Sequence, residues 1–273
     1  MSTKSLFVIS DTHVGLGSAV FPPDFKIHLA RPDEDVTANL SVGQAYLYEC
    51  WEYQLDRLPK VIDVFLINGD ALQGHRPPWA TKMTAPNLED QRDAALELFK
   101  PIARRARNVL VTKGTSYHSL EVGDYEYQLA KALGAKYSDH FDFKLAGKTI
   151  NACHGHSAFL MYRSQFLERE SHASRLAFSS EQVPLSDLII RSHGHFFTVY
   201  TSDKVTALMT PCWQLPTEYH AVRAASYYKT QETLGSILLE VTDEEMPDGV
   251  RVIRAPFRFA PPKQWTSVLN LDK

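Results

Sequence analysis

The chain has little cysteine and no large excess of charge of either sign. Its three cysteines, Cys50, Cys153 and Cys212, stand far apart in 273 residues. An odd number at such spacing argues against a disulfide framework and favours a reducing compartment. The formal net charge is −3, so no global basic field would attract nucleic acid. Binding of nucleic acid would therefore require a local basic groove.

Long apolar runs are also missing. No stretch approaches the roughly 18 consecutive apolar residues that a membrane helix needs. Residues 1–5 lead directly into a strand-like run without a signal-peptide pattern. We therefore expect a cytoplasmic protein without a membrane partner. Hydrophobic residues make up 44% of the chain, which is enough for a sizeable core.

Apolar runs of strand length alternate with helical patterns early in the chain, and strand runs dominate later, which predicts an α/β sandwich. The expected strands lie near 5–10, 61–68, 108–113, 142–153, 187–192, 197–201, 205–210, 234–241 and 249–258. The expected helices lie near 41–58, 89–107, 122–134 and 158–178. Residues 14–40 and 71–88 are expected to be long loops, either a lid or substrate wall, or surface insertions.

Five short clusters of possible metal ligands each follow an apolar, strand-like run. They are Asp11-Thr12-His13, Asn68-Gly69-Asp70, Gly114-Thr115-Ser116-Tyr117-His118, His154-Gly155-His156 and His193-Gly194-His195. Sheets of this kind bind ligands at the carboxyl ends of their strands, so five strand ends would bring these side chains to one rim. Imidazole and carboxylate ligands together suit Mn, Fe or Zn better than Ca or Mg. Because the clusters span the chain and need a shared sheet, we expect one domain over residues 1–273.

In their order, these clusters resemble the motifs of the calcineurin-like metallophosphoesterase superfamily. The order is Asp-x-His, Gly-Asp, a glycine-containing loop with a histidine, a single histidine, and a final His-x-His, over residues 11–195. The third cluster departs from the usual Gly-Asn-His of the family. Its Gly114-Thr115-Ser116-Tyr117-His118 resembles a Gly-Thr-x-x-His variant of a phage-associated branch.

The resemblance implies an α/β fold of two sheets packed as a sandwich and flanked by helices. It also implies two divalent metal ions, with Mn favoured and Fe, Zn or Ni as alternatives. The implied ligands are Asp11, His13 and His195 on the first ion, His154 and His193 on the second, and Asp70 as the bridge between them.

The departure in the third cluster leaves several roles open. The family's asparagine gives an amide oxygen to the second metal, whereas Thr115 offers only a hydroxyl, so the second ion would bind more weakly or water would fill that position. We expect His118 to be the general acid that protonates the leaving alkoxide. It could instead be a ligand of the second metal, or an ordinary loop histidine.

The resemblance implies a metal-dependent phosphoesterase that uses a metal-bound hydroxide for in-line attack on a phosphoester. A phosphodiester or nucleic-acid substrate is favoured, because the chain lacks the Asp-Arg-Gly and Gly-Asn-His-Glu runs of protein phosphatases. Gln73 stands where purple acid phosphatases have a tyrosine ligand. The alternatives are a phosphomonoesterase for a small metabolite, a metal-dependent hydrolase of non-phosphate substrates, and a metal-free binding module on the same fold. No substrate-binding residue and no oligomeric state follows from the sequence.

Overall fold

Two β-sheets organise the part of the chain that the computed structural model describes, namely residues 2–28, 35–75, 82–118, 124–155, 163–181, 183–215 and 233–254. The helices in these residues are α1 (Val42–Leu55), α2 (Leu88–Ala103), α3 (Tyr125–Ala132) and α4 (Arg163–Ser179). The strands are β1 (Lys4–Ile9), β2 (Lys26–Ile27), β3 (Val36–Thr37), β4 (Ile62–Asn68), β5 (Ala106–Thr112), β6 (Lys136–Ser138), β7 (His140–Leu145), β8 (Lys148–Cys153), β9 (Leu188–Arg191), β10 (Thr198–Thr201), β11 (Thr206–Met209), β12 (Ile237–Val241) and β13 (Val250–Arg254).

The six-stranded sheet has the order β13-β12-β1-β4-β5-β6, and the five-stranded sheet has the order β10-β11-β9-β8-β7. Within the first sheet, β1, β4 and β5 run parallel to one another. Within the second, β8, β9 and β11 are parallel. The loops that follow β1, β4, β5, β8 and β9 carry the five sequence clusters, so the clusters leave the two sheets at strand carboxyl ends.

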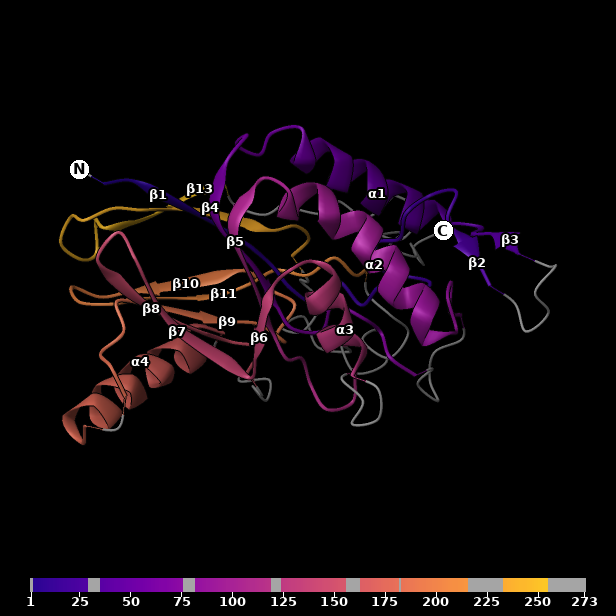
Figure 1. Cartoon of the computed structure of the whole chain (residues 1–273). Coiled ribbons are helices and arrows are strands. Elements are labelled where there is room, and N and C mark those ends of the chain that lie inside the picture. The colour runs from indigo at the N-terminus through magenta and orange to yellow at the C-terminus, as the bar shows by residue number, and fades with distance from the viewer. Residues whose placement is uncertain are drawn as a thin grey trace, which may run out of the picture.

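Alternating side chains of the strands build the layers. In β1, Leu6 and Val8 are buried in the core between the two sheets, while Phe7 and Ile9 face the core under α1, α2 and α3. On the other side, Ile189 of β9 packs in a third core with α4. Figure 1 shows the resulting order of layers, with α1 and α2 on one side of the paired sheets and α4 on the other. The predicted two-sheet α/β sandwich flanked by helices is thus confirmed.

Buried glutamines on α1 and α2 hold the described parts of the loops at 14–40 and 71–88. The Nε2 of Gln44 donates to the carbonyl oxygen of Leu16 at 3.2 Å. Gln91 both accepts from the N–H of Gly74 and donates to its carbonyl oxygen, each at 2.9 Å. The two loops also pair through an isolated bridge between Val14 and Leu72. They are therefore packed against one another, and the first also contains the short β2–β3 hairpin, which was not expected.

The largest error in the expected secondary structure concerns residues 142–153, which are not one strand. They belong to β7 and β8, an antiparallel hairpin that turns at Ala146 and Gly147, whose φ values are 46° and 80°. Strand β6 was also not expected. The four helices were expected at nearly their observed positions. Residues 122–123, 158–162 and 255–258 of the expected elements lie outside the described residues.

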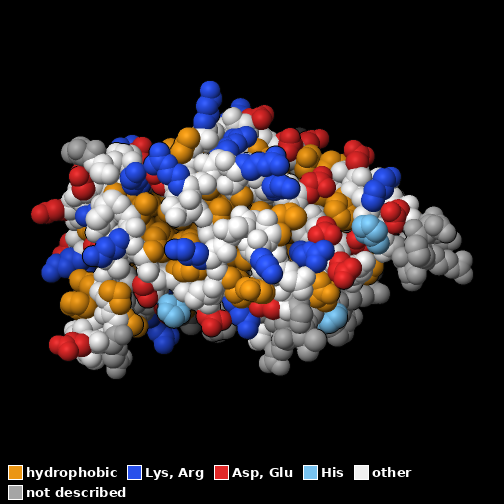
Figure 2. Space-filling view, viewed as in Figure 1, with side chains coloured by type: hydrophobic (Ala, Val, Ile, Leu, Met, Phe, Trp, Pro, Cys, Tyr) orange, Lys and Arg blue, Asp and Glu red, His pale blue; other side chains and the backbone are white. Residues whose placement is uncertain are grey.

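Charged side chains of both signs share the surface. On the face shown in Figure 2, the Lys and Arg side chains are interspersed with Asp and Glu. This distribution agrees with the small net charge of −3. Among the described helices, none has both the length and the apolar character needed to cross a bilayer.

Candidate metal centre

An unusual backbone conformation marks the loops at the carboxyl ends of β1, β4 and β9. Left-handed φ values between 41° and 70° occur at five of the six predicted ligands, Asp11, His13, Asp70, His193 and His195. Backbone bonds connect the first two loops, because the N–H of Asp11 donates to Gly69 and that of His13 to Asp70. The first two loops thus continue side by side beyond their strands, and a parallel bridge between Val14 and Leu72 follows the two ligand clusters.

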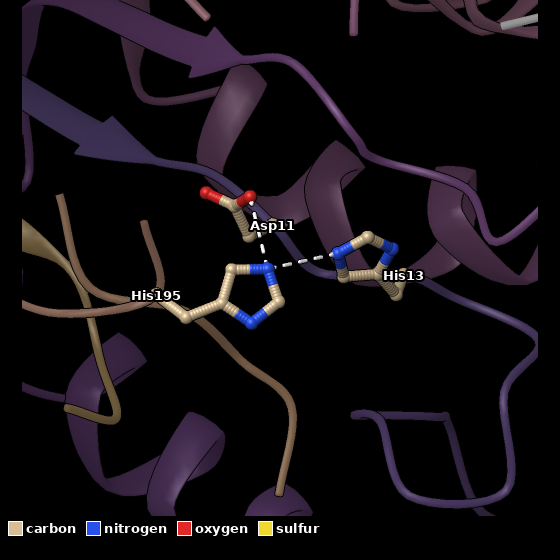
Figure 3. A group of neighbouring side chains, drawn as sticks. All are labelled: Asp11, His13 and His195. Atoms are coloured by element: carbon tan, nitrogen blue, oxygen red, sulfur yellow. Dashed lines mark hydrogen bonds and ion pairs between the residues drawn. The ribbon is translucent and has the colours of Figure 1, made fainter. Parts of the chain in front are cut away.

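Asp11, His13 and His195 form the first group of side chains (Figure 3). The Nε2 of His195 lies 3.3 Å from Asp11 Oδ1 and 3.2 Å from the Nε2 of His13. Two of these residues leave the six-stranded sheet after β1, and the third follows β9 of the five-stranded sheet. The structure therefore brings together, from both sheets, the three side chains that the sequence assigned to the first ion.

Asp70, His154 and His193 form a second group. The Nε2 of His154 lies 2.9 Å from Asp70 Oδ2, and the Nδ1 of His193 lies 3.9 Å from the same oxygen. Asp70 also belongs to a group with His13 and His118, and the ligand atoms within each group lie within 4.8 Å of one another. The carboxylate of Asp70 is thus shared between neighbouring groups.

The ring of His154 is oriented by the backbone of β4. Its Nδ1 donates to the carbonyl oxygen of Asn68 at 2.8 Å, which leaves Nε2 directed at Asp70. Gly69, with φ of 79°, makes room for this ring, since a Cβ there would lie 2.6 Å from His154 Cγ. Any residue larger than glycine would displace the imidazole.

The donor atoms of the second group fit a cation. The Nε2 of His154 and the Nδ1 of His193 are buried, and neither has a hydrogen-bond partner in the described structure, although both lie close to Asp70 Oδ2. Buried polar atoms are normally paired, so unpaired nitrogens beside a carboxylate indicate a missing partner. Imidazole nitrogens and carboxylate oxygens suit Mn, Fe or Zn, and the residues present therefore fit divalent transition-metal ions.

The charges of the site are balanced by carboxylate–imidazole pairs. Burial alone would raise the pKa of Asp11, but His154 and His195 outweigh it and lower this pKa to about 2. Burial likewise opposes the ionised form of Asp70, yet His154 and His118 hold its pKa well below the usual range. Although burial disfavours its cation, the pKa of His154 rises to about 10 because Asp70 and Asp11 are close. A metal ion that binds here must displace such protons.

The third loop contacts the shared carboxylate through its backbone and through Thr115. The N–H of Thr115 donates to Asp70 Oδ1 at 2.7 Å, and its hydroxyl donates to the same oxygen at 3.1 Å. Gly114 lies so close that a Cβ there would be 2.2 Å from Asp70 Oδ1. In the described structure Thr115 therefore holds the carboxylate that the sequence assigns as the bridge.

His118 lies beside the first group. Its ring centroid is 4.6 Å from that of His13, and its Nδ1 lies 2.6 Å from the carbonyl oxygen of Gln73. A carbonyl oxygen can only accept, so Nδ1 carries the proton of this bond and Nε2 is the second ring nitrogen. Burial, together with His118, lowers the pKa of His13 well below its usual value. His118 thus groups with His13 and Asp70, whereas His154 and His193 form the other group with Asp70.

Two parts of the site were missed from the sequence. Beneath the rim, Asn68 donates to Ser192 Oγ at 2.6 Å and accepts from Thr112 at 2.9 Å, which connects the two sheets. Glu126 of α3 accepts hydrogen bonds from two of the loops at the rim. Asn68 belongs to the second cluster, so its place in the sequence could have indicated a role at the site. No sequence pattern marks Glu126, because its partners are backbone N–H groups.

Comparison with known proteins gives only remote similarities. No protein-family model and no curated protein matches the sequence. Among solved structures, an archaeal phosphodiesterase is 13% identical and aligns over 91% of this chain and 98% of its own, with a TM-score of 0.45. Vps29 from Entamoeba histolytica in complex with zinc is 15% identical over 92% of this chain and 98% of its own, also with a TM-score of 0.45.

A predicted phosphoesterase from Streptococcus pneumoniae TIGR4 is 14% identical and aligns over 93% of this chain and 98% of its own, with a TM-score of 0.39. Three features of the chain itself are more informative than these remote similarities. They are the order of the five clusters, the two-sheet sandwich, and the proximity of the six side chains at its rim. In these features the chain resembles the calcineurin-like metallophosphoesterases.

Proposed function

We propose that this chain is a binuclear metal-dependent phosphoesterase that acts preferentially on phosphodiesters, including nucleic-acid ends. The observation that carries the proposal is the position of Asp70. Its carboxylate lies within reach of His13 on one side and of His154 and His193 on the other. A carboxylate has two oxygens and can serve two cations at once, which supports a site for a pair of ions.

The residues that would hold the ions are those of the two groups, with Asp11, His13 and His195 around one and His154 and His193 around the other. Two divalent cations bound there would neutralise phosphoryl charge and lower the pKa of an attacking water. The low pKa values of Asp11 and Asp70 keep both carboxylates ionised at neutral pH, so they are ready to bind cations. Mn²⁺ is the ion we favour, because the ligand set mixes imidazole and carboxylate.

His118 is our candidate for the general acid. Because its Nδ1 donates to Gln73, Nε2 is the atom that would deliver a proton to the leaving alkoxide. The bond to a backbone carbonyl also fixes the ring, which a proton donor requires. A role as a metal ligand is the alternative, and the group with His13 and Asp70 would then make it a ligand near the first ion.

Hydrolysis of matched aryl esters tests the proposed function. We expect the protein supplied with Mn²⁺ to cleave an aryl phosphodiester faster than the corresponding phosphomonoester, and a chelator to abolish both activities. Asp70→Asn serves as the control for a contaminating enzyme and should remove the activity. Faster monoester cleavage would favour a phosphomonoesterase, and cleavage of a carboxylic ester alone would favour a different hydrolase. Binding of Mn²⁺ without any hydrolysis would indicate a binding module.

A further inference from the structure

One side chain of α3 joins the loop that follows β4 to the loop that follows β5. Glu126 is only 1% exposed. Its Oε1 accepts the N–H of Ala71 at 2.8 Å, and its Oε2 accepts the N–H of Gly114 at 2.8 Å. Each oxygen of the carboxylate therefore holds one loop.

Both contacts lie next to the carboxylate of Asp70. Ala71 directly follows Asp70 in the chain, and Gly114 directly precedes Thr115, whose N–H donates to Asp70 Oδ1 at 2.7 Å. The backbone at Gly114 also contacts this carboxylate, since a Cβ there would overlap with Oδ1. Movement of either loop would thus change the direction in which the Asp70 oxygens point.

We propose that Glu126 is a positioning residue that fixes the orientation of the Asp70 carboxylate and so allows two metal ions to share it. The inference rests on the proposed function, because it assumes that Asp70 is the bridge. A carboxylate suits the task, because it has an acceptor for each of the two N–H groups. Glutamine has the same size but presents an NH₂ group to one of them, so one loop would lose its anchor.

Manganese titration of the metal-free protein tests this role without any activity measurement. We expect the unmodified chain to bind two Mn²⁺ ions and to give the electron paramagnetic resonance signal of a magnetically coupled pair. In Glu126→Gln the second ion should bind about 10- to 100-fold more weakly, as is typical when a residue that orients a ligand is changed. The signal of the coupled pair should be lost or altered at equal Mn²⁺ occupancy.

Asp124→Ala is the matched control, because it weakens the start of the same helix without removing either hydrogen bond of Glu126. Asp124 caps α3 by accepting the N–H of Tyr127 at 3.0 Å, and it also accepts the hydroxyl of Tyr137 at 2.7 Å. Loss of both bonds should lower the free energy of unfolding by about 2 kcal/mol and leave the Mn²⁺ titration unchanged.

Two results would overturn the positioning role while leaving the proposed function intact. One is a Glu126→Gln variant that retains the coupled pair with unchanged affinity. The other is an Asp124→Ala variant that weakens the second ion as strongly as Glu126→Gln, because the effect would then follow from the stability of the helix. A wild-type chain that binds fewer than two ions would overturn the proposed function, and this inference with it.

Discussion

The Nδ1 atom of His118 lies 2.6 Å from the carbonyl oxygen of Gln73, a residue three positions after Asp70. If this arrangement serves a general acid, His118→Asn should slow esters with poor alkoxide leaving groups by about 10²- to 10⁴-fold. Esters with good phenolate leaving groups should be nearly unaffected, because they need no proton. Rates across a series of leaving groups, with metal content measured in parallel, check this prediction.

The same experiment separates the other roles of His118. If His118 is a metal ligand, His118→Asn should lose one bound ion and cleave every substrate more slowly to the same extent. Equal slowing of all substrates at full metal content would leave His118 with only a structural role. His140→Asn provides the control, because this histidine lies in β7 with its side chain 65% exposed. It should behave as the unmodified protein in both measurements.

Metal content should respond differently to the loss of a shared ligand and of an unshared one. Asp70→Asn should weaken both ions, because its carboxylate contacts both groups of side chains. His13→Ala should mainly empty the first site, since His154 and His193 remain in place around the second. Elemental analysis after loading with Mn²⁺ measures this difference. Loss of both ions to the same extent in the two variants would contradict the assignment of Asp70 as the bridge.

The close approach of Gly114 to Asp70 predicts a selective effect of one methyl group. In Gly114→Ala the added Cβ would overlap with Asp70 Oδ1, so we expect metal affinity to fall by about 10- to 100-fold. Gly147→Ala in the β7–β8 turn is the comparison, since a Cβ there meets no atom within 4 Å. Its φ of 80° should cost about 1 kcal/mol of stability without any change in metal binding. Calorimetric titration with Mn²⁺ and urea unfolding measure the two effects.

Glu126 gives the metal-free protein a pH dependence of known sign. Burial, together with the charge of Asp70, raises the pKa of this carboxyl from 4.5 to about 7. The folded protein therefore keeps a proton that the unfolded chain has lost, and the free energy of unfolding should fall as pH rises from about 4.5 to about 7. Over this pH range, the titration of Glu126 should lower the free energy of unfolding by an amount on the order of 3 kcal/mol.

Urea unfolding at about pH 5 and about pH 8 isolates this contribution when the metal-free protein is compared with Glu126→Gln. The other titrating groups are common to the two proteins, so their effects cancel. The stability of the unmodified protein relative to the variant should be lower at the higher pH. A difference that does not change with pH would show that the carboxyl titrates normally.

The sequence predicted what depends on local order along the chain. Asp11 and Asp70 each follow an apolar run, and β1 and β4 are parallel neighbours, so the proximity of these two residues could be expected. His193 follows β9 of the other sheet, so its approach to Asp70 depends on how the two sheets pack, and the expectation of one shared sheet was wrong. The turn at Ala146 and Gly147 was missed, because alternation of apolar residues continues on both sides of it. Glu126 was missed because its contacts are with backbone N–H groups, one of them 55 residues away, and only the folded chain brings them together.

The left-handed backbone at Asp11, His13, Asp70, His193 and His195 concentrates conformational strain at the residues of the metal centre. Glycine adopts this conformation freely, while other residues lose about 1–3 kcal/mol at each such position. Keeping aspartate and histidine there sacrifices stability at the rim, a compromise that natural proteins typically make where a reactive site must be preserved. Replacing Asp11 by glycine should therefore relieve the backbone strain at one position, but it would take away the acceptor of the His193 N–H and leave the metal centre incomplete.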